Sequence, residues 1–222
     1  TIGIAGIATF RTGRIDVGSA LKNTSIGELA GDAYTTGANN TAVGYLALTE
    51  NTTGGSNVSI GYAAVDANTT GSQNTGVGYA ALGQNTTADE NTGVGYNALQ
   101  ANTTGTVNTA VGSQALASSS TGSNNTAVGR KALYANTTAS NNTAVGYQAM
   151  VANTTGARNT SVGQDALQAN TTADDNTAVG YAALNANTTG FRNTAVGKDA
   201  LVANTTSAHN VAFGYQALYT NT

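Results

Sequence analysis

Nine asparagines in this chain begin the sequence Asn-Thr-Thr, which is an acceptor sequence for N-linked glycans. They are Asn51, Asn68, Asn85, Asn102, Asn136, Asn153, Asn170, Asn187 and Asn204. Asn23, Asn57 and Asn159 match the related Asn-X-Ser form. One interpretation is a row of glycans along the molecule. The alternative is a turn whose Asn and Thr side chains hydrogen-bond between neighbouring units, and we favour it because the motif belongs to a repeat.

Tyrosine is the second chemically informative residue type, because it follows a glycine in seven places: Tyr45, Tyr62, Tyr79, Tyr96, Tyr147, Tyr181 and Tyr215. If the repeats stack, Tyr45, Tyr62, Tyr79 and Tyr96 form an aromatic ladder. Lys198 then lies between Tyr181 and Tyr215, within the range of cation–π contacts. Rows of aromatic rings can bind sugars. Stabilisation of the stack through cross-strand contacts is the interpretation we favour.

Catalytic chemistry has little support in the sequence. The acidic pairs Asp89-Glu90 and Asp174-Asp175 stand five repeats apart, roughly 24 Å at the strand spacing. That separation is too large for paired-carboxylate catalysis. His209 is the only histidine, and the absence of cysteine removes disulfides and thiolate metal sites. We expect no enzyme activity, no cofactor and no metal site.

The threonine pairs raise the hypothesis of ice binding, which uses regular threonine arrays on solenoids. Adjacent residues of a strand point to opposite faces, so only one threonine of each pair can join such an array. Tyr34 and the sequence Ser119-Ser120-Thr121 interrupt the Asn-Thr-Thr series. The sequence therefore disfavours this hypothesis.

A single repeat in the sequence predicts the structural elements that position these residues. A glycine recurs every seventeen residues without insertion or deletion: Gly27, Gly44, Gly61, Gly78, Gly95, Gly112, Gly129, Gly146, Gly163, Gly180, Gly197 and Gly214. An asparagine stands four places before each glycine, and an alanine three places after it. A fixed short period is typical of stacked repeat units. Unbroken spacing indicates that every unit sits on its predecessor in register.

The repeat predicts an all-β fold, a parallel β-solenoid (β-roll) of 17-residue coils with two short strands and two turns per coil. In Thr41-Ala42-Val43 and its equivalents, the Thr and Val positions are two residues apart, so their side chains lie on the same face of the strand. We expect this face to point inward. The small residue between them then faces outward, against a second subunit. The alternative makes the Ala-Leu segment a helical turn. Strand-plus-helix repeats need about 20–29 residues, so seventeen are too few.

The domain prediction is a cap or junction over residues 1–22, which break the period, followed by the solenoid over residues 23–222. A coil of seventeen residues buries few apolar side chains, so we expect association of the chain with itself through the small-residue face. A homotrimer and an end-to-end polymer are both consistent with that expectation. Surface glycans are a further candidate partner.

Composition argues against other partners. Charged residues are 9% of the chain, the net charge is -3, and the eight Lys and Arg residues are scattered. Nucleic-acid binding needs a basic face, so we expect none. No apolar run approaches the ~18 residues of a membrane span, so we expect no membrane insertion.

The sequence Asn-Thr-Ala-Val-Gly-Tyr-X-Ala-Leu at residues 40–48, nearly copied at residues 142–150, resembles repeats of phage tail-fibre shafts and related bacterial surface proteins. It is also similar to the Asn-Ser-Val-Ala-Ile-Gly repeat of YadA-like trimeric autotransporter adhesin heads, whose unit is shorter. The resemblance covers residues 23–222. It implies a left-handed β-roll, three chains per fibre, and extracellular display on a virion or cell surface. The repeat regions of these families carry no catalytic residues, so the resemblance implies none here.

Three functions are therefore expected, in order of preference. The first is an extracellular structural shaft. The second is an adhesin-type module that contacts glycans or cells, and the third is a self-assembling, glycosylated filament.

Overall fold

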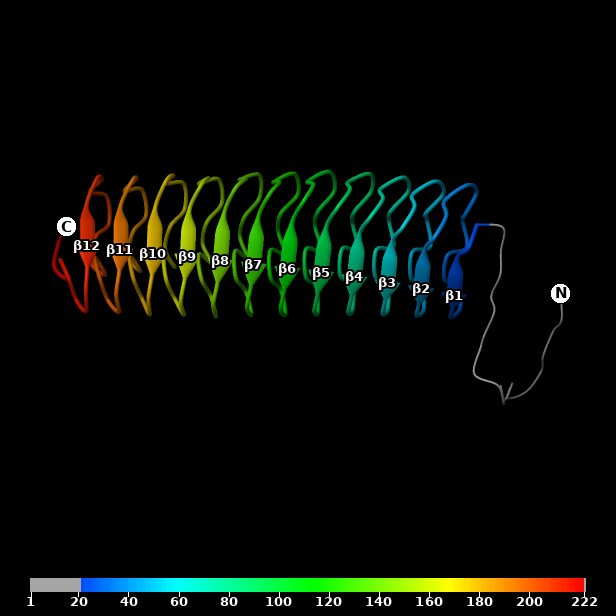
Figure 1. Ribbon diagram of the computed structural model, residues 1–222, viewed down its shortest axis with the longest axis horizontal. Helices are drawn as coiled ribbons and strands as arrows, with labels where there is room; N and C mark the ends of the chain where they lie inside the picture. The colour runs from blue at the N-terminus through cyan, green and yellow to red at the C-terminus, as the bar shows by residue number, and fades with distance from the viewer. Residues whose placement is uncertain (1–20, 222) are drawn as a thin grey trace, which may run out of the picture.

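A computed structural model describes residues 21–221 (Figure 1). The predicted N-terminal cap therefore lies outside the described residues, apart from Leu21 and Lys22. The described chain forms one parallel sheet, with one strand of three residues in each coil. The strands are β1 Thr24–Ile26, β2 Thr41–Val43, β3 Val58–Ile60, β4 Thr75–Val77, β5 Thr92–Val94, β6 Thr109–Val111, β7 Thr126–Val128, β8 Thr143–Val145, β9 Thr160–Val162, β10 Thr177–Val179, β11 Thr194–Val196 and β12 Val211–Phe213.

The strands follow one another in chain order across the sheet, from β1 to β12, and they stand side by side along the long axis of the molecule (Figure 1). Equivalent residues face each other across every pair. Thr143, Ala144 and Val145 of β8, for example, pair with the equivalent residues of β9, which lie seventeen positions later. The predicted parallel β-solenoid of 17-residue coils is confirmed.

The orientation predicted for the strand residues is wrong. In strands β2 to β12 the middle position, not the outer two, points into the coil. Ala144 is fully buried, whereas Thr143 and Val145 are half-buried, and Ile26 at the same place as Val145 is 50% exposed. The small residues are required because the opposite wall of the same coil lies directly against them. Ser59, for example, donates a hydrogen bond of 2.6 Å to the Ala64 carbonyl of its own coil. No second subunit is needed to cover this face.

The opposite wall of each coil is built from turns, so the prediction of a second strand is also wrong. Gln148 and Met150, on the wall opposite β8, have φ values of 51° and 55°. The Gln148 N–H donates to the Arg130 carbonyl of the preceding coil, and the Met150 N–H donates to the Ala166 carbonyl of the following coil. In an extended parallel strand, residues two apart bond to the same neighbour. The described residues contain no helix, so the strand-plus-helix alternative is excluded for them.

The core of each coil consists of three side chains. In the coil that contains β8 these are Ala144, Ala149 and Met150, all fully buried. Leucine occupies the place of Met150 in nine other coils. The first coil departs from this pattern, with Gly31 in the leucine place and Tyr34 in the asparagine place of the Asn-Thr-Thr motif. A Cβ on Gly31 would overlap the Tyr34 ring, so one aromatic ring fills the space that a leucine fills elsewhere.

The repeating glycine closes the turn after each strand. Gly129 has a φ of +130°, and a Cβ added to it would overlap the backbone of Gly146 in the next coil. Only glycine fits both the backbone angle and the approach of the next coil. The glycine series therefore fixes the stacking of the coils.

One surface position carries avoidable backbone strain. Val107 has a φ of 58° and is 48% exposed, and β-branched residues rarely adopt this left-handed conformation. Asparagine adopts it readily and stands at the equivalent places Asn39, Asn124 and Asn141. We expect Val107→Asn to raise the free energy of unfolding by about 1 kcal/mol, measured by urea denaturation.

The same substitution at Val162, in strand β9, serves as the control. Val162 is also partly exposed, but its backbone is extended and asparagine is a poor strand former. Val162→Asn should lower the free energy of unfolding. Equal effects of the two substitutions would show that backbone strain at Val107 is not the cause.

Candidate functional site

The four tyrosines Tyr45, Tyr62, Tyr79 and Tyr96 lie in one row on the surface. Neighbouring ring centroids are 5.6, 4.9 and 5.4 Å apart, and the Tyr62 and Tyr79 planes differ by 4°. Each ring is close to half exposed. Because the inner two rings, Tyr62 and Tyr79, each have a neighbouring ring on both sides, they present edges and hydroxyl groups to solvent, not faces. Sugar binding on aromatic residues uses ring faces, so this geometry favours a structural role for the row.

Cations continue the tyrosine row farther along the rod. Lys198 Nζ lies 5.6 Å from the Tyr181 ring centroid and 5.7 Å from that of Tyr215, as expected from the spacing. Arg130 stacks over Tyr147 at 5.7 Å and donates a hydrogen bond of 3.3 Å to its hydroxyl group. Exposed cation–π contacts each contribute about 0.5–1 kcal/mol. These side chains therefore connect successive coils on the outside of the rod.

The asparagines of the Asn-Thr-Thr motifs form a ladder inside the rod, which we call the Asn51 ladder. Its members, each bonded to the next or the preceding rung, are Asn51, Asn68, Asn85, Asn102, Asn136, Asn153, Asn170, Asn187, Asn204 and Asn221. Asn153 shows the pattern. Its Nδ2 donates 3.1 Å to Oδ1 of Asn136 and 2.9 Å to the Gly156 carbonyl oxygen.

Both amide hydrogens of such an asparagine are therefore in use, and the nine candidate glycosylation residues are fully buried. An N-linked glycan replaces one of those hydrogens and must reach solvent. Glycan attachment at these positions stays a prediction, and it requires addition before the coils close.

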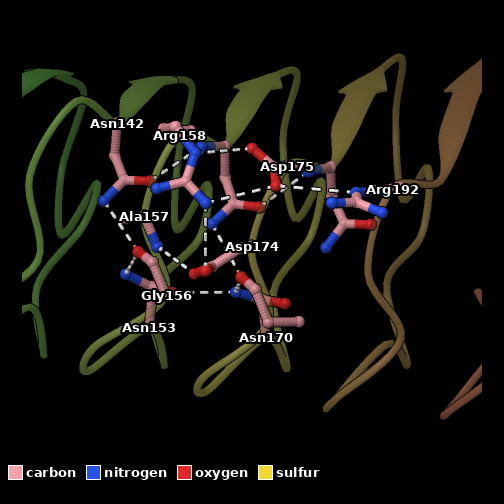
Figure 2. A network of polar contacts seen from close by, with 12 residues as sticks. Asn142, Asn153, Gly156, Ala157, Arg158, Asn170, Asp174, Asp175 and Arg192 are labelled. Atoms are coloured by element: carbon pink, nitrogen blue, oxygen red, sulfur yellow. Dashed lines mark hydrogen bonds and ion pairs between the residues drawn. The ribbon is translucent and has the colours of Figure 1, made fainter.

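A second ladder, which we call the Asn40 ladder, runs beside the first. It consists of the asparagines four places before the repeating glycines: Asn23, Asn40, Asn57, Asn74, Asn91, Asn108, Asn125, Asn142, Asn159, Asn176, Asn193 and Asn210. Oδ1 of Asn142 accepts a hydrogen bond of 2.9 Å from the backbone N–H of Asn159, the next rung. Its Nδ2 donates 2.9 Å to the Gly156 carbonyl, where Asn153 also donates (Figure 2). The two ladders thus meet on one carbonyl in the coils from Gly54 to Ser207, except in the coil of Ser119.

The Asn51 ladder is interrupted once within the described coils, at Ser119. The shorter side chain does not reach its neighbours, and Asn102 Oδ1 and Ser119 Oγ are buried without hydrogen-bond partners. Asn136, the next rung, donates only to Ala139 of its own coil. Because an unsatisfied buried polar group costs about 1–3 kcal/mol, this break is a weak point of the rod.

We expect Ser119→Asn to restore the ladder and to raise the free energy of unfolding by about 1–2 kcal/mol, measured by urea denaturation. The new amide supplies a donor for Asn102 and an acceptor for Asn136. Ser118→Asn is the matched control, because Ser118 is half-buried and lies outside both ladders. An equal gain in the control would contradict this explanation.

The two threonines of each Asn-Thr-Thr motif have different environments. The first donates its hydroxyl hydrogen to the next coil, as Thr154 does to the Thr171 carbonyl at 3.0 Å, and Ser120 keeps this bond. The second is exposed in every described coil: Thr36, Thr53, Thr70, Thr87, Thr104, Thr121, Thr138, Thr155, Thr172, Thr189 and Thr206. The sequence suggested an interrupted array, but the exposed column is unbroken. Ice binding stays an untested hypothesis, and the charged Asp89 and Asp174 that lie two residues beyond this column disfavour it.

Four charged side chains lie together on the turns that precede strands β9 to β11, and we call them the Arg158 cluster: Arg158, Asp174, Asp175 and Arg192 (Figure 2). Arg158 Nε donates 2.6 Å to Asp175 Oδ1, and its Nη2 lies 3.1 Å from Asp174 Oδ2. The hydrogen bond from Arg158 lowers the pKa of Asp175, and the same bond raises the pKa of Arg158. Sequence reasoning missed this cluster, although Arg158, Asp175 and Arg192 are spaced by the repeat period.

The remaining candidates, Asp89 and His209, make local contacts on different parts of the rod. Asp89 caps the backbone N–H of Ser72 at 2.7 Å, in a coil far from Asp174 along the rod. His209 packs edge-on against Phe191, with ring centroids 5.1 Å apart. Within residues 21–221, no group of three His, Cys, Asp or Glu side chains is placed to hold a metal ion. The same residues include no helix that could cross a membrane.

The molecule thus belongs to the class of tandem-repeat parallel β-solenoids, with polar ladders inside and side-chain rows outside. Comparison of the chain with protein-family models, with curated protein sequences and with solved structures finds no match in any of the three.

Proposed function

We propose that the chain is a structural rod, a non-catalytic shaft segment of an extracellular fibre. The observation that supports this most strongly is the pair of asparagine ladders. Each coil is tied to its neighbours by backbone pairing along the sheet and by Asn40-ladder bonds, and all coils except those of Tyr34 and Ser119 add Asn51-ladder bonds. Such a molecule resists bending because bending must stretch many short hydrogen bonds at once. The resemblance to tail-fibre shafts and adhesin heads supports display on a virion or cell surface.

Self-association remains part of this proposal, but through a different face from the one expected. The small residues of strands β2 to β12 are buried in their own coils, so this face is not available for an interface there. The last position of each strand carries Val, Ile or Phe in every described coil, and several are exposed, including Ile26, Ile60, Val111 and Val162. A continuous apolar stripe on the surface of a rod marks an interaction surface. A homotrimer that packs these stripes together is the assembly we propose.

Electron microscopy of the purified full chain tests the straight rod, and light scattering tests the homotrimer. The described coils should appear as a straight particle of uniform length, roughly 53 Å for eleven steps of the strand spacing. Compact or flexible particles would contradict the rod. A mass of three times 22.0 kDa is expected for the homotrimer, and a mass of 22.0 kDa would contradict the homotrimer alone.

A further inference from the structure

A groove of about 300 Å³ lies on the surface of the rod, beside the Arg158 cluster. Its lining includes Arg158, Asp175, Phe191 and Arg192, and the exposed threonines Thr172 and Thr189. The chain has few charged residues overall, so this gathering of charge with an aromatic ring and with His209 beside it is a local exception. Whether the groove can bind another molecule depends on which of its groups are free of internal bonds.

The two carboxylates are already in use. Asp174 Oδ1 accepts 2.8 Å from the backbone N–H of Ala157, and its Oδ2 faces Arg158 at 3.1 Å. Both oxygens of Asp175 accept from Arg158, at 2.6 and 3.2 Å. These bonds use the Nε and Nη2 groups of Arg158. The carboxylates therefore hold the local geometry and leave no strong acceptor for a ligand.

The groups that remain available are a cation, an apolar ring and two hydroxyls. Arg192 makes one long ion-pair contact of 3.9 Å, from Nε to Asp175, and its Cζ lies 5.8 Å from the centroid of the Phe191 ring, yet its side chain is 62% exposed. Phe191 is 42% exposed. Thr172 and Thr189 are exposed, and no hydrogen bond within the described chain uses their hydroxyls. A ligand that fits must bring an anionic group, an apolar face and hydroxyls.

We propose that this groove binds a carboxylate-bearing saccharide, such as a uronic or sialic acid. The free edge of the Arg192 guanidinium presents the paired donors that a carboxylate accepts in bidentate form. The part of the Phe191 ring that Arg192 and His209 leave exposed provides apolar surface for C–H groups of the sugar, and the threonine hydroxyls bond to sugar hydroxyls. Asp175 is a positioning residue, because it lies against Nε of Arg192 and leaves the opposite edge toward solvent.

Isothermal titration calorimetry of the full chain tests the proposal with four defined probes. The acidic probes are trigalacturonic acid and sialyllactose, and their neutral counterparts are the methyl-esterified trigalacturonate and lactose. We expect at least one acidic probe to bind, and its neutral counterpart to bind at least tenfold more weakly. Absence of binding by both acidic probes at millimolar concentration would overturn the proposal.

Variants taken from the repeat itself identify the site with little risk to folding. Arg192→Gln and Phe191→Ala introduce residues that stand at the equivalent places Gln73 and Ala157. We expect Arg192→Gln to weaken acidic-sugar binding at least tenfold, and Phe191→Ala to weaken it severalfold. Arg130→Gln removes the same charge from the tyrosine row, where Gln164 stands at the equivalent place, and it should have no effect.

Equal losses in Arg192→Gln and Arg130→Gln would mean unspecific charge attraction and would overturn the site. Circular dichroism of each variant checks that the coils are intact. The outcome is independent of the rod proposal, since straight particles in electron microscopy are expected whether or not the sugars bind.

Discussion

Gly129→Ala should lower the free energy of unfolding by at least about 3 kcal/mol, and it is the substitution that we expect to disturb the stack most. A residue with a side chain at φ +130° costs about 1–3 kcal/mol in backbone strain. The added methyl group also meets the backbone of Gly146, and overpacking against rigid neighbours costs about 1–3 kcal/mol more. Urea denaturation followed by circular dichroism measures the loss.

Gly122→Ala is the matched control for this experiment. A Cβ on Gly122 also approaches a carbonyl of the next coil, that of Ala139, but its φ is not in the left-handed region. Alanine already occupies the equivalent place as Ala88, Ala139 and Ala173. The coil spacing adapts to alanine there, whereas the Gly129 series contains glycine in all twelve coils. Similar losses in the two variants would contradict the special role of the repeating glycine.

Asn142→Asp should lower the free energy of unfolding at pH 7 by about 3 kcal/mol or more, because it buries an acceptor against an acceptor. One carboxylate oxygen still accepts the N–H of Asn159. The other faces the Gly156 carbonyl, to which the asparagine donates in the native rod. The site is fully buried, so an ionised carboxylate there is poorly solvated.

This cost depends on pH in a direction that can be worked out. Burial beside a carbonyl favours the protonated acid, so the folded-state pKa of the introduced carboxyl lies above its unfolded value of about 3.9. The protonated carboxyl can donate to Gly156. The loss of stability is therefore smallest below about pH 4 and grows as the pH rises from about 4 toward the raised folded pKa.

Urea denaturation at pH 3, 5 and 7 separates this effect from general damage. Asn142→Ala also breaks the ladder, but its cost relative to the native chain should not change with pH. Asn141→Asp places the same charge one residue earlier, on the surface, where Asp175 stands in another coil. It should change stability little at any of the three pH values. A cost of Asn142→Asp that is constant with pH would argue against a buried carboxylate at this rung.

The stacking and register of the rod could be predicted from the sequence because they depend on positions that tolerate one residue type. The repeating glycine and its asparagine are constrained by contacts with the next coil, and those contacts recur every seventeen residues. The tyrosine row and the place of Lys198 follow directly from that register.

The side of the strand that faces inward could not be predicted from apolar character. Val145 is more apolar than Ala144, yet Ala144 is inside, because the two walls of this coil lie too close together for a larger side chain. The turn-built wall was also missed. Gln148 and Met150 adopt positive φ although neither residue type favours it, and the bonds to both neighbouring coils compensate for that strain. Composition alone does not signal such a conformation.

Of the candidate surface sites, the sequence located the tyrosine row and missed the Arg158 cluster. The signal was present, since Arg158, Asp175 and Arg192 occupy one place in three successive coils. The seventeen-residue spacing does not show which of these side chains contact one another. Asp175 bonds closely to Arg158 and only loosely to Arg192, and that asymmetry leaves the Arg192 guanidinium without a close polar partner.

Each coil bonds to its neighbouring coils through the same backbone pairing, so the length of the rod depends only on the number of coils. Since each coil pairs only with the one before and the one after it, gain or loss of a whole 17-residue unit leaves the cross-section unchanged. Unequal recombination between near-identical repeats can therefore lengthen or shorten the molecule in steps of about 4.8 Å without a new folding problem. The length of the rod can therefore change in evolution while its cross-section stays the same.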